Sequence, residues 1–391
     1  MAREMTRREF CGKAATIVAA TMLVLPLTLL AKPLTEEDKS NAKKKRMLGQ
    51  FFTERESWLQ PQVEAFIKAT GDNIAYDPFA GTGCLLSLAK KRIDTITGIK
   101  GLDIDTTLGW DVNDSLVNIP HVDGAVIITN PPYISNYSAS RKKIGDGLQK
   151  YFDATPYDDV YLLALDKMLE AQSNVVAIVP ETFINSPYRQ KRKLQSVTIL
   201  EKNPFLDTDT PVVVVCFDSV DKDFGKIKIY KDSTYISTLQ EVENARLAPD
   251  NSVAMRFNDP DGWLGVRCVD TTNPDDMIRF AFKGDIDYDW EKGIKVSSRL
   301  LTLISIEVPL ECRVEFIAEC NRILAHIRKV SHDIILSPFK GNMKNGVRRR
   351  RLDFMTCRAI VEKAYKKTVG SGSANEQQYL PGFYEAKERV A

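Results

Sequence analysis

The chain has 391 residues and a mass of 44.0 kDa, which is enough for two domains with separate hydrophobic cores. Its hydrophobic content of 43% is typical of a soluble globular protein, and a net charge of +2 is too small to indicate a nucleic-acid partner by itself. Seven cysteines without a CxxC pair and only three histidines argue against a disulfide framework and against a metal site, so no metal is expected.

Residues 1–35 form a hydrophobic N-terminal segment. Arg7 and Arg8 precede an uncharged run from Ala14 to Ala31, a pattern typical of a twin-arginine export signal. The run has the threshold length of a membrane span, although Pro26 interrupts it. Three interpretations stay open: a buried helix or membrane tether at residues 14–31, an export signal, or a start codon assigned too far upstream. We favour the first and third over export.

After a polar linker at residues 36–46, the sequence predicts a unit of one strand, a glycine turn and a helix. The strand covers residues 74–76, and the amphipathic helix covers residues 85–91. Between them lies the turn Asp77-Pro78-Phe79-Ala80-Gly81-Thr82-Gly83. This order is typical of the first βα turn of a doubly wound sheet, where small residues let the backbone approach a ligand.

The next strands end in polar residues. A strand at residues 98–105 carries Asp103 about twenty residues after the glycine turn, the usual position for binding ribose hydroxyls. Asp114 ends a further short segment, and the apolar strand 122–129 leads directly to Asn130. Carboxyl ends of parallel strands share one edge of a sheet, so we expect these side chains to gather there.

The tetrapeptide Asn130-Pro131-Pro132-Tyr133 suits methyl transfer to an amino nitrogen. The lone pair of an exocyclic amine is delocalised, so two acceptors aimed at its N–H bonds are needed to free it for attack on a methyl sulfonium. The side-chain oxygen of Asn130 and the carbonyl of Pro131 supply two such acceptors, and proline fixes the backbone between them. Tyr133 offers a flat face for the acceptor ring. As an isolated pattern the tetrapeptide also describes an ordinary strand-to-loop turn.

Taken in order, these motifs resemble the S-adenosylmethionine-dependent amino-methyltransferases of DNA, in particular the N6-adenine enzymes whose target recognition domain follows the catalytic domain. The resemblance covers roughly residues 45–220. It implies an α/β fold with a doubly wound, Rossmann-like methyltransferase sheet and a C-terminal mixed, largely helical recognition domain. The implied domains are residues 36–222 for methyl transfer and residues 223–391 for DNA recognition.

The resemblance also implies roles for individual residues. S-adenosyl-L-methionine is the implied cofactor, and the residues matched to its site are Thr53, Asp77, Phe79, Ala80, Gly81, Gly83, Asp103 and Asp114. Asn130 to Tyr133 match the catalytic tetrapeptide. Phe217, at the end of the run 210–217, matches an aromatic residue that stacks on the second face of the extruded base.

The chain departs from this family between Asp103 and Asp114. The stretch is too short for the helix usually found there, so Asp103 and Asp105 compete for the ribose role and the adenine pocket is expected to be open. Trp110 lies in this stretch, where it could flank the adenine of the cofactor, but a core position is the commoner outcome for such a residue.

The pattern changes after residue 218. Residues 225–230 alternate as a strand does, and longer helices are expected near residues 311–330 and 352–367. The segment 337–351 combines glycines, amides and six cations, and we interpret it as a loop that opens a helix and contacts DNA phosphates and guanine edges. A solvated basic loop is the alternative. The predicted DNA contacts are Lys340, Lys344, Arg348, Arg349, Arg350 and Arg351.

These features together predict a site-specific DNA adenine-N6 methyltransferase acting on a base rotated out of duplex DNA. A restriction endonuclease that recognises the same site is an expected partner. A cytoplasmic location is expected because the cofactor and chromosomal DNA are cytoplasmic. Two alternatives stay open: methylation of a protein glutamine or an RNA base, and a catalytically silent DNA-binding or envelope-associated protein.

Overall fold

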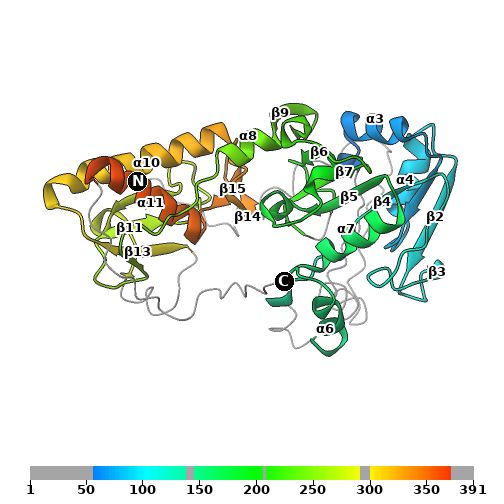
Figure 1. The fold of residues 1–391 in the computed structure, drawn as a ribbon, viewed down its shortest axis with the longest axis horizontal. Coiled ribbons are helices and arrows are strands. Elements are labelled where there is room, and N and C mark those ends of the chain that lie inside the picture. Colours follow the sequence, from blue (N-terminus) through cyan, green and yellow to red (C-terminus); the bar gives the residue numbers. More distant parts are fainter. Residues whose placement is uncertain (1–55, 138–144, 206–207, 291–299, 371–391) are drawn as a thin grey trace, which may run out of the picture. The chain divides into compact units, whose positions relative to one another are not determined.

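The computed structural model describes residues 56–137, 145–205, 208–290 and 300–370 (Figure 1). The described residues all belong to one compact unit. The predicted segment 1–35, the linker 36–46 and Thr53 lie outside the described residues. Within the described ranges, no helix combines the length and the hydrophobicity that crossing a membrane requires.

Nine strands form one mostly parallel sheet in the order β3-β2-β1-β4-β5-β7-β6-β8-β9. Strands β1 to β5 run parallel, and β7 is antiparallel to both β5 and β6. The strand order is doubly wound and Rossmann-like, so the fold class predicted from the sequence is confirmed. The strands are β1 (Ile74–Asp77), β2 (Gly98–Asp103), β3 (Asp111–Val112), β4 (Ala125–Thr129), β5 (Val175–Pro180), β6 (Leu194–Ile199), β7 (Val212–Phe217), β8 (Lys228–Lys231) and β9 (Thr234–Thr238).

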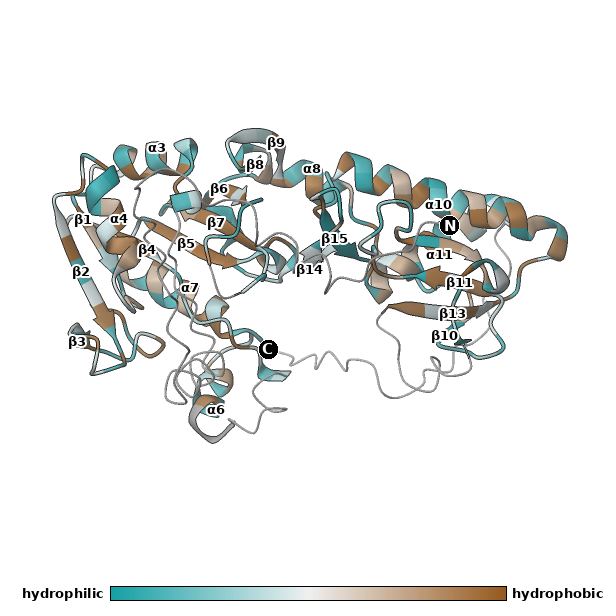
Figure 2. Ribbon diagram, turned by 180° about the vertical axis from the view of Figure 1, so that it is seen from behind, coloured by the Kyte–Doolittle hydropathy of each residue, from teal (hydrophilic) through white to brown (hydrophobic). Residues whose placement is uncertain are grey.

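Hydrophobic residues cover both faces of the sheet, as continuous apolar strands require. Every residue of β4 is buried, and successive side chains point to opposite faces. Val126 and Ile128 pack in the cluster of α3 (Pro61–Thr70) and α4 (Cys84–Arg92). Ile127 packs in the cluster of α7 (Val160–Ala171). Figure 2 shows this hydrophobicity along β4 and β5.

The sheet continues beyond residue 222, the predicted end of the catalytic domain. Strand β8 is parallel to β6, and β9 is antiparallel to β8, so residues 228–238 complete the same sheet. The short helix α8 (Leu239–Asn244) follows, and Thr238 and Glu241 cap it reciprocally. The strand predicted at residues 225–230 therefore extends the predicted catalytic domain.

The C-terminal part combines a second sheet with two long helices. Its four strands are antiparallel in the order β10-β13-β11-β12, and α10 (Arg313–Val330) packs against α11 (Phe354–Thr368). Both predicted helices are confirmed, each starting two residues later than expected. The strands of this sheet are β10 (Met255–Phe257), β11 (Leu264–Arg267), β12 (Arg279–Phe282) and β13 (Leu301–Ile306).

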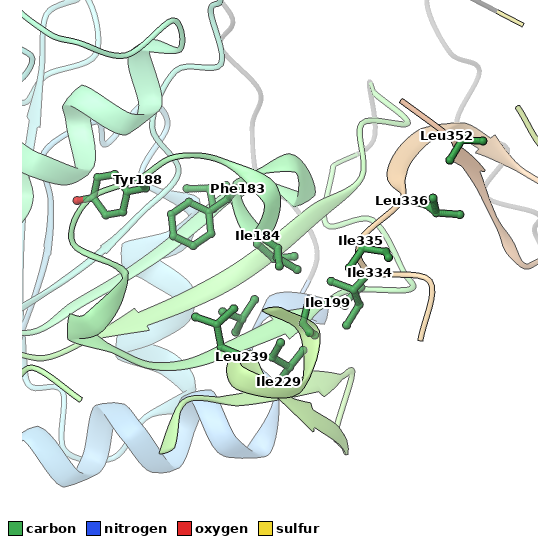
Figure 3. Packing of buried hydrophobic residues seen from close by; sticks show 14 of the residues in the cluster. Phe183, Ile184, Tyr188, Ile199, Ile229, Leu239, Ile334, Ile335, Leu336 and Leu352 are labelled. Carbon is green, nitrogen blue, oxygen red and sulfur yellow. The ribbon is translucent and has the colours of Figure 1, made fainter. Parts of the chain in front are cut away.

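The two sheets share one hydrophobic core. Ile199 at the end of β6 belongs to the same buried cluster as Ile334 and Ile335, which follow α10 (Figure 3). The Asn185 side chain donates a hydrogen bond to the Ile334 carbonyl at 2.9 Å. This packing fixes the C-terminal segment against the carboxyl ends of the central strands.

Candidate active site at the carboxyl edge of the sheet

The glycine turn after β1 is held by the neighbouring strand β2. The Ala80 N–H donates to the Leu102 carbonyl at 2.9 Å, and the Gly81 N–H donates to Asp103 Oδ2 at 2.8 Å. Gly81 and Gly83 have φ values of 52° and 75°, a region that residues with a Cβ rarely adopt. The turn thus depends on glycine at these two positions, and it ends at the N-terminus of α4.

Asp103 and Asp105 lie in different environments. Asp103 is 7% exposed, and its Oδ1 accepts a hydrogen bond from the Asp105 N–H at 2.9 Å. Both of its carboxylate oxygens therefore accept hydrogen bonds from backbone N–H groups. Asp105 is exposed and accepts hydrogen bonds from Thr107. Asp103 therefore shapes the glycine turn directly, while Asp105 is the more accessible carboxylate at the same strand end.

Trp110 occupies the space beside the glycine turn where the chain lacks a helix between β2 and β3. Its indole N–H donates to the Gly81 carbonyl at 2.9 Å. Its ring packs so closely on Gly83 and Gly101 that a Cβ built on Gly101 would lie 2.5 Å from an indole carbon. The region expected to be open is therefore covered on this face by one partly buried tryptophan.

Asp77 links β1 to the strand that carries Asn130. Its side chain is 1% exposed, and its Oδ1 accepts the Thr129 hydroxyl at 2.5 Å and the Phe79 N–H at 2.9 Å. Burial raises the pKa of this carboxyl to about 7, and the charge of Asp103 adds to the shift. The last residue of β1 and the last residue of β4 are thus tied together inside the sheet.

Asn130 follows β4 directly, and the Tyr133 side chain reaches it. The Tyr133 hydroxyl lies 2.5 Å from Asn130 Oδ1 and 2.8 Å from the carbonyl oxygen of Ile178 in β5. A hydroxyl has one hydrogen, so it donates to one of these oxygens at a time. Burial raises the pKa of Tyr133 well above its usual value, so the hydroxyl stays protonated. The predicted amine acceptor of Asn130 is therefore in contact with Tyr133 before any substrate enters.

Two aromatic rings flank Tyr133 edge to face. The Tyr161 ring centroid lies 6.3 Å from that of Tyr133, and the Phe205 centroid lies 6.2 Å away. Sequence reasoning missed Phe205. Its position in the sequence, seven residues before the start of β7, could have indicated it. An antiparallel strand begins at the edge of the sheet where the parallel strands end, so residues that precede β7 lie near Asn130.

The stacking role predicted for Phe217 is wrong in this structure. Phe217 ends β7 and pairs with Val175, the first residue of β5, so it lies toward the opposite end of the sheet from Asn130. Its side chain is 0% exposed and packs against Phe183 and Tyr188. The hydrophobic run 210–217 was identified correctly, but its direction in the sheet was not.

Asp114 lies just beyond β3 and is partly exposed. Its Oδ2 accepts hydrogen bonds from the Tyr151 hydroxyl at 2.8 Å and from Lys150 Nζ at 3.1 Å. Both partners belong to α6 (Gly145–Asp153). An adenine amine that donated to this carboxylate would either displace these two donors or share the carboxylate with them.

The basic segment 337–351 is a β-hairpin, which corrects its interpretation as a loop. β14 (Ser337–Asn342) pairs with β15 (Arg348–Arg351), and α11 begins only after Asp353. Arg348 and Arg350 form ion pairs with the two oxygens of Glu181, whose side chain is 2% exposed. These two arginines are thus bound inside the protein.

The other predicted DNA contacts on the hairpin are more accessible. Arg349 donates to the Asp270 carbonyl at 2.7 Å, and its guanidinium lies over the Phe339 ring. Lys340 and Lys344 are exposed, and Arg351 is partly exposed. The predicted cations therefore divide into two arginines that are paired with a buried carboxylate and four cations that are not.

No family model and no curated protein matches the chain. Among solved structures, the chain is similar to a type I restriction-modification methyltransferase subunit of Streptococcus thermophilus, with 16% identity, a TM-score of 0.33, and coverage of 50% of this chain and 52% of that one. It thus spans about half the length of that protein.

Two further solved structures are similar at the same level. One, from Listeria monocytogenes, is described as a class I S-adenosylmethionine-dependent methyltransferase, with 13% identity, a TM-score of 0.33, and coverage of 50% and 72%. The other is the EcoKI M protein of a type I restriction enzyme, with 12% identity, a TM-score of 0.30, and coverage of 76% and 74%. These similarities are weak, and the fold assignment stands on the strand order itself.

Proposed function

We propose that the chain transfers a methyl group from S-adenosyl-L-methionine to the N6 amine of an adenine in duplex DNA. The observation that carries the proposal is the adjacency of two strand ends. β1 and β4 are paired in the sheet, so the glycine turn after Asp77 and the acceptor oxygen of Asn130 follow neighbouring strands on one edge. A methyl donor at the first and an amine at the second would be side by side, and proximity is the main source of rate in such a transfer.

The residues at this edge fit the cofactor. The glycine turn leaves its backbone free of a Cβ atom at Gly81, while the Trp110 ring fills the space beside Gly83. Carboxylates for ribose hydroxyls and an adenine amine lie at the end of β2 and just beyond β3. Asp103 or Asp105 would hold the ribose, and Asp114 the amine. When bound, the cofactor supplies an electrophilic methyl group on a sulfonium.

Asn130 and Pro131 would accept the two hydrogens of the target amine. Because the Tyr133 hydroxyl contacts the Asn130 oxygen, an entering adenine would replace that contact, and Tyr133 would then stack on the base. Phe205 packs edge to face on Tyr133 and is 2% exposed, so it supports the Tyr133 ring from inside the protein, and no second stacking residue is proposed in place of Phe217. No acid, base or metal is required, because the methylated amine loses its proton to solvent.

Duplex DNA would lie along the carboxyl edge, with one adenine rotated out of the stack. The exposed Lys340 and Lys344 and the partly exposed Arg349 and Arg351 of the hairpin are our proposed contacts to its phosphates and bases. A restriction endonuclease that recognises the same sequence is the proposed cellular partner.

Methyl incorporation tests the proposal. The purified chain is incubated with isotope-labelled S-adenosyl-L-methionine and plasmid DNA, and the digested nucleosides are separated. We expect label in N6-methyladenine. Asn130→Ala should lower the rate on the order of 100-fold or more without weakening cofactor binding, because it removes an acceptor that acts as the amine rehybridises.

Asn118→Ala is the matched control, since Asn118 is exposed and lies in the same part of the chain. Its activity should equal that of the wild type. Label recovered in protein glutamine or in RNA would overturn the DNA substrate and support the alternative acceptor. A parallel fall of cofactor affinity and rate in Asn130→Ala would remove Asn130 from the catalytic step.

A further inference from the structure

A second polar pocket lies on the same edge of the sheet as Asn130. Its volume is about 320 Å³. Strands β6 and β8 run parallel to β5, so their carboxyl ends share the edge of β4 and β5. The pocket is lined by Ile199, Glu201, Lys231, Ile236, Arg328, Lys329, His332, Asp333, Asn342, Gly346, Val347, Arg348 and Arg350.

The strand order sets the spacing between this pocket and Asn130. Three strand steps separate β4 from β6 and four separate it from β8. At about 4.8 Å a step, the pocket is roughly 14–19 Å from the catalytic strand along the edge. Duplex DNA rises about 3.4 Å per base pair, so this spacing corresponds to roughly four to six base pairs.

Cations outnumber carboxylates in the lining, with three arginines and two lysines against Glu201 and Asp333. The arginines are engaged: Arg328 pairs with Asp270 and Asp333, and the other two pair with Glu181. Lys231 pairs with Glu201. These ion pairs fix the side chains that form the walls of the pocket, and the net charge of the pocket remains positive.

Lys329 and His332 differ from the rest of the lining. Both are exposed, and among the described residues neither side chain forms a hydrogen bond or an ion pair, while the charge of His332 acts on the Glu241 carboxylate of α8. His332 and Asp333 have φ values of 50° and 64°, so two consecutive non-glycine residues adopt the left-handed conformation here. The Asp333 N–H donates to the Arg328 carbonyl at 2.8 Å, which closes the end of α10. This turn presents Lys329 and His332 at the pocket.

We propose that this pocket binds a backbone phosphate of duplex DNA, with Lys329 as the ion-pairing residue and His332 as a hydrogen-bond donor. The inference rests on the proposed function, because it places the phosphate a few base pairs from the rotated adenine. A phosphate suits the pocket because it is a compact anion with several acceptor oxygens, and lysine binds it as a point charge. It also assigns a DNA contact to the end of α10, outside the basic hairpin.

A structural alternative competes with this assignment. A cation in the last turn of a helix stabilises the negative end of the helix dipole, and Lys329 is in the last turn of α10. Such a lysine would affect folding and would not affect DNA affinity. The experiment therefore measures both quantities.

The test is a binding titration of the full chain with a random-sequence DNA duplex at several salt concentrations, without cofactor. Lys329→Gln and His332→Asn remove the two groups, and asparagine tolerates the left-handed backbone. We expect Lys329→Gln to lower the slope of log affinity against log salt by about one unit, and Lys329→Arg to restore it. His332→Asn should weaken binding severalfold with little change of slope.

Lys363→Gln is the matched control, because Lys363 is an exposed lysine of α11 that does not line the pocket. It should leave affinity and slope unchanged. An unchanged slope in Lys329→Gln with a lower Tm would overturn the phosphate site in favour of the helix-dipole role. If Lys363→Gln lowered the slope as much as Lys329→Gln does, the phosphate site would be overturned, because any surface lysine would then contribute equally to DNA binding.

This test is separable from that of the proposed function. Methylated adenine together with an unchanged slope in Lys329→Gln would defeat only the phosphate pocket. A slope that falls by one unit in a chain that methylates no adenine would support the pocket and defeat only the proposed reaction.

Discussion

Asp77 shows how one buried carboxyl couples the two halves of the site. It joins the glycine turn to β4 through the Thr129 hydroxyl, yet its burial opposes ionisation and raises its pKa to about 7. In the unfolded chain the pKa of this group is near its ordinary value of 3.8. Between these two pKa values the folded state holds a proton that the unfolded state has lost, so stability falls as pH rises through this window.

We therefore expect Asp77→Asn to change the pH dependence of stability. Asparagine keeps an acceptor for Thr129 and Phe79 but carries no charge. Relative to the wild type, the variant should be more stable at pH 8 than at pH 5, measured as Tm in the two buffers. Asp285→Asn, at an exposed carboxylate, is the control and should show no such difference. Parallel Tm curves for wild type and Asp77→Asn would contradict the raised pKa.

Tyr133 has two separable features, a ring and a hydroxyl. The proposed reaction uses the ring for stacking, while the hydroxyl contacts Asn130 only until the base enters. Tyr133→Phe should thus keep methyl transfer within a few fold of the wild type. Tyr133→Ala should lose about ten- to a hundredfold, since stacking on an aromatic ring is worth about 1–3 kcal/mol per base. Steady-state rates on a DNA substrate would decide, and equal losses in both variants would show that the hydroxyl takes part in the reaction.

At the scale of elements, the main connection is the ion pair between β15 and the turn after β5. Glu181 follows the last residue of β5 and receives Arg348 and Arg350, and Arg348 also donates to the Leu200 carbonyl at 2.8 Å. A single buried carboxylate thus holds the hairpin against the ends of β5 and β6. Removing one member of such a group leaves buried charge without compensation.

Glu181→Gln should therefore destabilise the chain by about 3–5 kcal/mol. The measurement is chemical denaturation of the variant beside Glu64→Gln, which breaks an exposed ion pair with Lys68 on α3 and should cost about 1 kcal/mol or less. The double variant Glu181→Gln with Arg350→Met should cost less than the two single changes added together, because the partners interact directly. Strict additivity would show that the pair does not couple these elements.

The sequence predicted the first strands well because each is a short apolar run that ends in a distinctive turn. Asp77, Asp103 and Asn130 were found by their place after such runs, and the structure puts them on neighbouring strand ends. Phe205 was missed because the hydrophobic pattern of a strand carries no information about its direction. The ion pair of Arg348 with Glu181 could not be predicted from the sequence either, because the two residues are 167 positions apart in the chain.

For the whole molecule, the informative feature is the continuity of sheet and core. The described residues form one unit in which β8 and β9 complete the central sheet and one buried cluster extends from β5 to α11. The residues proposed to bind the cofactor and the residues proposed to contact DNA are therefore parts of one folded body.

The extension of the sheet by β8 and β9 limits how this protein can be recombined. A cut at residue 222 would turn β6, which is buried along most of its length, into an edge with a row of unpaired N–H and C=O groups. A graft that exchanges the part proposed to read DNA would thus have to retain residues through Asn244, where α8 ends. The earliest position at which the chain can be divided without breaking the central sheet is thus after β8, β9 and α8, and the motifs of the sequence had placed it before them.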